Sequence, residues 1–192
     1  YGMTRPGIFR NIIIMKKVIV ISTSLRAGSN SDTLADKFIE GAQAAGNEVE
    51  KISLKDKQIA FCRGCLACQK LGRCVINDDA NTIMAKVLEA DAVCWATPIY
   101  YYEMSGQMKT LIDRMNCLYA SDYQFRKVYM IATAAEDGDF IFGKAYNGLQ
   151  GWVDCFEKAE LCGLVCGGGI NEPKEAKTCA DVMRKAYELG KN

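Results

Sequence analysis

The sequence predicts an α/β fold in which a doubly wound parallel sheet of five strands carries helices on both faces. Apolar, β-branched runs alternate along the chain with segments in which apolar residues recur at helical spacing. The first run, residues 18–21, has no polar position, which is typical of a strand buried on both faces. Such β-α alternation favours right-handed crossovers between parallel strands.

The N-terminal half supplies three of these strands. The first leads through a polar turn, residues 22–31, into an amphipathic helix that Asn30 or Ser31 is placed to cap. Residues 48–54 alternate apolar and polar side chains, which predicts a second strand nearer the sheet edge. Residues 59–77 have no periodicity and predict a loop.

The remaining elements complete the alternation. We expect a helix capped by Asp78 and Asp79, a strand at residues 92–96, an extended turn at 97–102, a helix capped by Ser105, a strand at 128–133, a long turn at 134–143, a helix reaching Ala159, a strand at 161–166 and a helix from Pro173 to Gly190. Ligands of such sheets bind at the carboxyl ends of the strands. The turns after the first, third and fourth strands are therefore the candidate site.

Composition excludes several classes of protein. The chain has no histidine, which rules out Ser–His and Cys–His nucleophiles and histidine-ligated metals. Its 24 basic and 23 acidic residues give a net charge of +1, without the basic stripe of a nucleic-acid-binding protein. No apolar run approaches membrane-spanning length, so neither nucleic acid nor a membrane is an expected partner.

The cysteine content predicts the cellular compartment, and the first residues of the sequence bear on the domain boundaries. Ten cysteines without a secretory signal favour a reducing cytoplasm. Residues 1–14 are interpreted as an extension upstream of a natural start at Met15, and residues 15–192 as a single domain.

The turn after the first strand has the chemistry of an anion site. Unpaired backbone N–H groups and the positive end of the helix dipole converge at a helix N-terminus. The hydroxyls of this turn can bind phosphate oxygens, and Arg26 can neutralise their charge. Neither well-known glycine-rich phosphate signature is present, so an ordinary capped turn is the alternative.

Two motifs resemble the NAD(P)H-dependent FMN reductase family of flavodoxin-like proteins. Its members carry a first turn like G-S-P-R-x-G-x-N-S, and residues 23–31 here read TSLRAGSNS. Its third turn is like S-P-V-Y followed by S-x-x-x-K-x-x-I-D-R, and residues 97–100 and 105–114 here read TPIY and SGQMKTLIDR. The resemblance implies the flavodoxin-like strand order 2-1-3-4-5.

It also implies a set of FMN contacts. Those to the phosphate would come from Ser22, Ser24, Arg26, Ser29, Asn30 and Ser31, and those to the ring from Thr97, Pro98, Ile99, Tyr100, Tyr101, Thr133, Ala134, Ala135 and Glu136. Tyr102 stands where the family commonly has glycine, so this aromatic side chain would shield the flavin or occupy substrate space. A surface aromatic cluster or dimer contact is the alternative for these tyrosines.

Four cysteines form a second motif, with the spacing C-x2-C-x2-C-x5-C: Cys62, Cys65, Cys68 and Cys74. Successive two-residue gaps suit a [4Fe–4S] cluster, with zinc as second choice. The loop resembles that of the iron–sulfur flavoproteins, a branch of the same family. Packing or redox-active thiols are the alternative.

The sequence therefore predicts an oxidoreductase that passes electrons from NADH or NADPH through FMN to a quinone, flavin, nitro compound or redox protein. The hydride chemistry belongs to the cofactor, so no catalytic side chain is expected. The alternatives are an iron–sulfur flavoprotein or flavodoxin-type electron carrier without pyridine-nucleotide turnover, and a metal-dependent binding protein with an empty flavin site. The resemblance also implies a homodimer or homotetramer.

Overall fold

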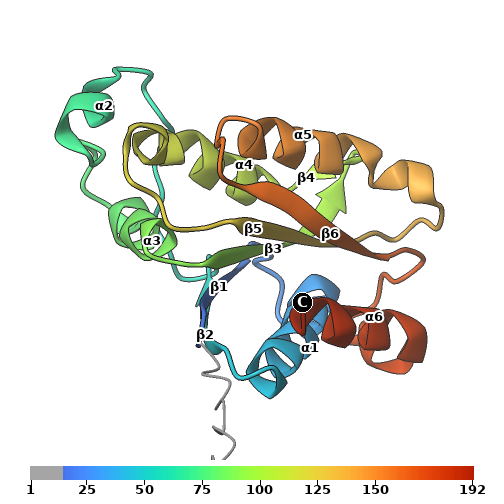
Figure 1. Cartoon of the computed structure of the whole chain (residues 1–192). Helices are drawn as coiled ribbons and strands as arrows, with labels where there is room; N and C mark the ends of the chain where they lie inside the picture. The colour runs from blue at the N-terminus through green and yellow to red at the C-terminus, as the bar shows by residue number, and fades with distance from the viewer. Residues whose placement is uncertain (1–14) are drawn as a thin grey trace, which may run out of the picture.

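The computed structural model describes residues 15–192 and places one sheet between two layers of helices (Figure 1). Five parallel strands run in the order β2-β1-β3-β5-β6, and β4 pairs antiparallel with β3. Their bounds are β1 (Lys17–Ser22), β2 (Glu48–Ser53), β3 (Ala92–Tyr100), β4 (Glu103–Met104), β5 (Lys127–Thr133) and β6 (Glu160–Gly167). With the two-residue β4 set aside, the flavodoxin-like order 2-1-3-4-5 is confirmed. The expected extension, residues 1–14, lies outside the described residues.

Helices cover the sheet on both faces, as predicted. On one face α1 (Asn30–Ala44) packs against α6 (Ala180–Gly190), and the other face carries α3 (Asp79–Leu88), α4 (Gly106–Arg114) and α5 (Gly143–Val153) (Figure 1). The short helix α2 (Ala67–Leu71) projects beyond the layers (Figure 1). The described residues also form the 3-10 helices η1 (Met115–Ala120), η2 (Asp139–Ile141) and η3 (Glu175–Thr178).

The strand β1 is buried on both faces, as its uninterrupted apolar run predicts. Ile19 and Ile21 enter the core beneath α3, α4 and α5, whereas Val18 and Val20 enter the core beneath α1 and α6. The edge strand β2 buries only Ile52. Alternate side chains of the central strands thus pack into two separate hydrophobic cores, one on each face of the sheet.

Caps set the starts of the helices, and two of the predictions about caps were wrong. The Asp78 carboxylate accepts from the Ala80 N–H and begins α3, and the Ser105 hydroxyl accepts from the Met108 N–H and begins α4. Asp79 is the first helical residue of α3 instead of its cap, and its carboxylate accepts from the Gln58 N–H. The helix α1 is capped by Ser29 and not by Asn30 or Ser31. Only Ser29 has non-helical dihedral angles, and its hydroxyl accepts from the N–H three residues on.

Four segments differ from the prediction. The predicted extended turn at 97–102 is largely strand, because β3 continues to Tyr100 where β4 pairs with it. A helical turn, α2, interrupts the predicted loop, and α5 ends at Val153 instead of reaching Ala159. Pro173 does not begin the last helix: Lys174 is left-handed and bonds to the first turn, so α6 begins only at Ala180.

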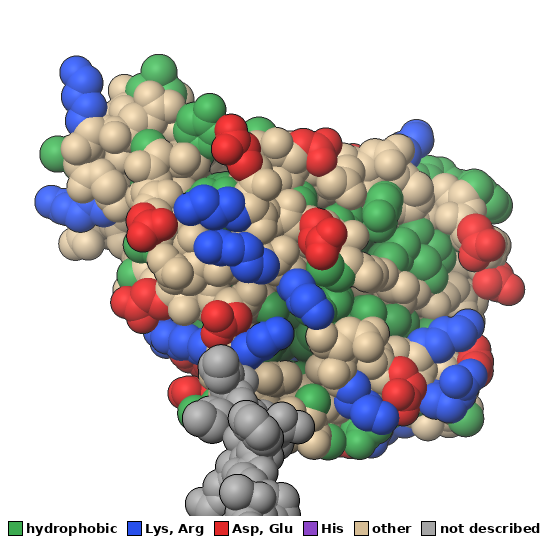
Figure 2. Space-filling view, viewed as in Figure 1, with side chains coloured by type: hydrophobic (Ala, Val, Ile, Leu, Met, Phe, Trp, Pro, Cys, Tyr) green, Lys and Arg blue, Asp and Glu red, His purple; other side chains and the backbone are tan. Residues whose placement is uncertain are grey.

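Charges of both signs are interspersed on the face shown in Figure 2. This distribution accords with the balanced composition and with the absence of a basic stripe in the sequence. Among the described residues no helix has both the length and the apolarity needed to cross a membrane.

Candidate functional site

The parallel register brings the predicted turns to one edge of the sheet. Ser22 at the end of β1 pairs with Ala96 in β3, and Pro98 in β3 pairs with Thr133 at the end of β5. The buried Thr23 hydroxyl donates to the Ala96 carbonyl at 3.0 Å and lies 2.9 Å from the hydroxyl of Ser105. The first turn is therefore fixed directly to the start of α4.

Hydroxyls gather in the first turn. The hydroxyls of Ser29 and Ser31 are 2.9 Å apart, and the Ser24 hydroxyl accepts from the Arg26 N–H at 3.3 Å. All three serines are buried, and the buried Ser22 hydroxyl has no hydrogen-bond partner in the described part of the chain. Buried hydroxyls normally have a hydrogen-bond partner, so the Ser22 hydroxyl is an exception at the end of β1.

Backbone donors add to these hydroxyls. Within residues 15–192, no acceptor is found for the N–H groups of residues 27–31, which lead into the first turn of α1. Successive free N–H groups at a helix N-terminus form a cradle for an anion. The first turn therefore fits a phosphate group.

The segment after β6 closes against this turn, which sequence reasoning missed. The Asn30 side chain donates to the Glu172 carbonyl at 2.9 Å and accepts from the Ala176 N–H at 3.0 Å. The Arg26 guanidinium donates to the Asn171 carbonyl at 2.6 Å. The amide of Asn30 is thus engaged by the protein itself, and the group it can offer a phosphate is its backbone N–H. Only the glycine triplet at 167–169 hinted at a special conformation here.

The third turn holds exposed aromatic side chains in an unusual conformation. Tyr101 and Tyr102 connect β3 to β4 with φ values of 52° and 65°. A hairpin turn with two left-handed residues normally takes Asn and Gly, so these tyrosines strain the backbone. Tyr101 is 98% exposed. Strain of this kind gathers at ligand sites, which makes this turn the candidate wall for a planar ring.

The fourth turn faces this wall. Thr133 and Ala134 are buried, while Ala135 and Glu136 are exposed. The Tyr102 hydroxyl donates to the Glu136 carboxylate at 3.2 Å, and this bond with the nearby charge raises the pKa of Tyr102. The two turns predicted to flank the ring are therefore in direct contact.

Not every predicted ring contact points to a ligand. Thr97 is fully buried, and its hydroxyl accepts from the Ser105 N–H at 3.0 Å and donates to the Pro98 carbonyl, so its side chain has a structural partner. Pro98 and Ile99 are half-buried, and Tyr100 is exposed. Two further side chains were missed: the Phe140 ring lies 6.1 Å from that of Tyr102, and the Lys144 ammonium lies 5.7 Å from it.

The four-cysteine loop lies beside η1 and the end of α4, on the α3–α5 side of the sheet. Cys62, Cys65, Cys68 and Cys74 all line one cavity of about 370 Å³. Within residues 15–192, no three metal-ligating side chains stand close enough together to hold an ion. The donor set suits a soft metal or cluster, and binding would require the thiols to draw together. A fifth thiol, Cys117, is buried in the core nearby. Its burial, and to a lesser extent the neighbouring Cys68, raises the pKa of Cys117.

A buried ion pair closes the base of this loop. The side chain of Arg114 is fully buried and lies 2.6 Å from the Asp78 carboxylate. Burial alone would raise the pKa of Asp78, but Arg114 and two backbone N–H groups hold this pKa below its ordinary value. This geometry is that of a structural ion pair.

This pair predicts a loss of stability in acid. A carboxyl with a lowered folded pKa stabilises the fold above its unfolded pKa, about 3.9, and this contribution disappears as the pH falls through the folded pKa. Urea unfolding at a series of pH values below about 4 measures this loss. As the pH is lowered, the unfolding free energy of the Asp78→Asn variant should fall less steeply than that of the wild type. Equal slopes would contradict the role of Asp78.

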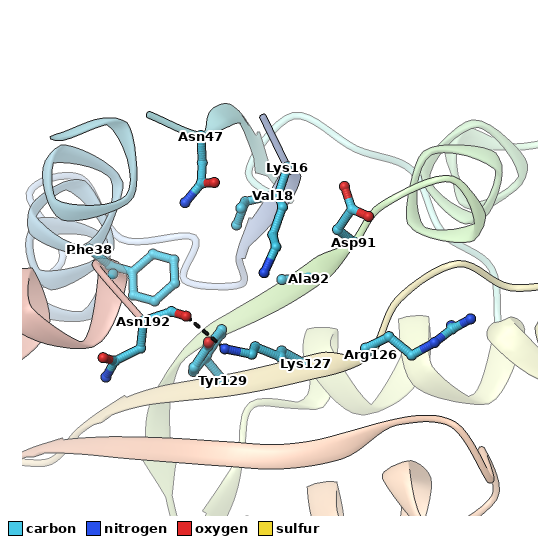
Figure 3. Close-up of a pocket in the computed structure, with 11 residues that line it drawn as sticks. Lys16, Val18, Phe38, Asn47, Asp91, Ala92, Arg126, Lys127, Tyr129 and Asn192 are labelled. Carbon is cyan, nitrogen blue, oxygen red and sulfur yellow. Dashed lines mark hydrogen bonds between the residues drawn. The ribbon is translucent and has the colours of Figure 1, made fainter. Parts of the chain in front are cut away.

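Another cavity opens at the amino edge of the sheet (Figure 3). Phe38 and Tyr129 form its floor, and the Lys127 ammonium donates to the Asn192 carbonyl at 2.7 Å. Its volume is about 110 Å³. Ligand pockets usually exceed about 300 Å³, and the ligands of this fold bind at the opposite edge.

Comparison with known proteins identifies the family of the chain. Residues 16–140 match the family model described as NADPH-dependent FMN reductase. The chain belongs to this family. The matched residues include the first turn, the cysteine loop and the strained tyrosine turn, so the family covers the whole candidate site up to Phe140.

Individual family members are similar over part of the chain. An iron-sulfur flavoprotein of Archaeoglobus fulgidus is 39% identical over 99 residues, covering 52% of this chain and 45% of that protein. An iron-sulfur flavoprotein of Methanocaldococcus jannaschii is 40% identical over 98 residues, covering 51% of each. The matches thus span about half the length of these relatives.

A solved structure shows the same fold over nearly the full length. The NAD(P)H:quinone oxidoreductase from Methanothermobacter marburgensis superposes with a TM-score of 0.70, covering 93% of this chain and 97% of that protein. The two sequences are 15% identical, so the likeness concerns the fold.

Proposed function

We propose that this FMN reductase family member is an oxidoreductase that binds FMN at the carboxyl edge of its sheet. The observation that carries the proposal is the first turn, where free backbone N–H groups and buried serine hydroxyls form an anion cradle. The cradle shares this edge with the paired turns of Tyr102 and Glu136. A phosphate site beside a ring-sized aromatic wall suits a phosphorylated flavin.

Each group of residues has a distinct task. Ser24, Ser29 and Ser31 bind the phosphate with the N–H groups of residues 27–31, and Arg26 offsets its charge. Residues 97–101 and 133–136 flank the ring and orient it. When bound, FMN supplies hydride and one-electron chemistry at its ring. The protein contributes position and electrostatics, consistent with the absence of histidine.

The names of related proteins support a proposal for the electron donor and acceptor. The family description names NADPH, so NADPH or NADH is the proposed donor. The names of related proteins favour a small-molecule acceptor such as a quinone, or a redox protein. We further propose a homodimer or homotetramer in the cytoplasm, with residues 15–192 as one domain after an extension at residues 1–14.

Flavin binding tests the proposal. Purified chain should bind FMN at least about 100-fold more tightly than riboflavin, because riboflavin lacks the phosphate and forfeits charged hydrogen bonds of about 1.5–3 kcal/mol each. Quenching of flavin fluorescence measures both dissociation constants. Bound FMN should then be bleached by NADPH or NADH under anaerobic conditions. Equal affinity for the two flavins would reject the cradle, and bleaching only by a reduced ferredoxin would favour an electron carrier.

A second proposal concerns the cysteine loop, which we infer binds a [4Fe–4S] cluster through Cys62, Cys65, Cys68 and Cys74. The supporting observation is that all four line one cavity. Protein purified without oxygen should contain about four iron and four sulfide per chain, and Cys62→Ser should remove the cluster absorbance while leaving FMN bound. Stoichiometric zinc in place of iron would favour the zinc alternative.

A further inference from the structure

One side chain from another part of the fold holds both ends of the cysteine loop, residues 60–76. Arg114, the last residue of α4, donates from Nη1 to the Ala60 carbonyl at 2.8 Å and from Nη2 to the Ile76 carbonyl at 3.2 Å. Its side chain is completely buried. The two ends of the loop are therefore fastened to a single guanidinium.

Asp78 joins the hydrogen bonds that Arg114 makes to the two ends of the loop. Its two carboxylate oxygens accept from Nη1 and Nη2 of Arg114 at 2.6 and 3.0 Å, and one of them also accepts from the Ala60 N–H at 2.9 Å. Such a bidentate pair fixes both position and orientation. The base of the loop is thus one connected network of hydrogen bonds.

The guanidinium also has an unused donor, because its buried Nε has no partner among the described residues. Arg114 and Cys74 line the same cavity. The positive charge of Arg114 therefore lies at the cavity that the four candidate ligands share.

Cys74 differs from the other three cysteines of the loop. It is buried, and the Asn81 side chain accepts from its N–H at 3.0 Å and donates to its carbonyl at 3.2 Å. Cys62 and Cys65 are exposed, and Cys68 is half-buried. The loop thus has one anchored thiol and three that are less constrained.

We propose that Arg114 is the positioning residue of the cysteine loop: it fastens both ends of the loop beside Cys74, the ligand that Asn81 holds in place, and offsets the negative charge that gathers when four thiolates share a metal. This inference rests on the proposed metal-binding role of the loop. Groups around the ligands of a metal hold them in place and tune the site, and their loss typically weakens metal binding 10–100-fold.

Cobalt(II) alone is a suitable probe, because its thiolate complexes absorb visibly. Arg114→Met is the direct variant. This single variant leaves the Asp78 carboxylate buried without its partner. The second variant therefore combines Arg114→Met with Asp78→Asn, which removes both charges of the pair and keeps a side chain that can cap α3. Anaerobic titration should show cobalt affinity about 10–100-fold weaker in both. Lys109→Met, on an exposed face of α4, is the matched control and should bind cobalt like the wild type.

Alkylation of the metal-free protein gives an independent readout. In the double variant, iodoacetamide should modify Cys74 at least about tenfold faster, because the loop opens locally, while the core thiol of Cys94 stays unreactive. Acceleration at Cys94 as well would mean general unfolding and overturn the proposal. Unchanged cobalt affinity in the variants would also overturn the positioning role of Arg114, while the metal-binding role of the loop would stand. A wild-type chain that binds no cobalt and, purified without oxygen, contains no iron and sulfide would instead reject the metal-binding role itself.

Discussion

The Gly41→Ala variant should be destabilised by about 3 kcal/mol or more, which is the upper range for overpacking a core. In the contact between α1 and α6, a Cβ on Gly41 would lie 2.0 Å from the Tyr187 carbonyl oxygen, and a Cβ on Gly190 would lie 2.0 Å from that of Phe38. Both neighbours are backbone atoms, which cannot rotate away. The two helices would have to move apart and open the core beneath them.

Urea unfolding of Gly41→Ala beside Gly151→Ala checks this expectation. Gly151 lies inside α5 with open space around its missing Cβ, so alanine there should raise stability by roughly 0.5–1 kcal/mol. The opposite signs separate steric overlap from helix propensity. A Gly41→Ala variant as stable as the wild type would contradict the close approach of the helices.

The Arg26→Glu variant should bind FMN at least about 100-fold more weakly, since it loses a charged hydrogen bond and gains repulsion from the phosphate. Arg26 is exposed, and within the described residues its guanidinium bonds only to the Asn171 carbonyl, so the fold should tolerate the change. Fluorescence titration with FMN measures the effect.

Riboflavin and a remote charge reversal are the controls for this variant. Riboflavin affinity should remain within a few-fold, because the charge interaction requires the phosphate. Lys37→Glu, at a half-buried position of α1, reverses a charge away from the turn and should leave FMN affinity unchanged. If Arg26→Glu bound FMN as tightly as the wild type, Arg26 would not contact the phosphate.

Local sequence patterns were sufficient for the framework of the fold. The unbroken apolar run of β1 predicted a central strand, and the alternation of β2 predicted an edge strand. Asp78 and Ser105 identified the starts of α3 and α4, because a cap depends only on side chain and backbone a few residues apart. The two turn motifs identified the family, and the parallel register places them at one edge of the sheet.

Contacts between distant segments were beyond such patterns. The engagement of Asn30 by residues 172–176 joins positions more than 140 apart, so the residue looks like a free phosphate ligand in sequence. The left-handed conformation of Tyr101 and Tyr102 depends on β4, a strand too short to leave a periodic signal.

By itself, the sequence determined the α/β class, the order of the strands, the family and the chemistry available in each turn. The tertiary structure decided which of those groups remain available to a ligand. Asn30 is used by the protein, Ser22 is left without a partner, and Arg114 fastens a loop that begins 54 positions earlier. Hydrogen bonds over such separations depend on how helices and loops pack, which no local run of residues records.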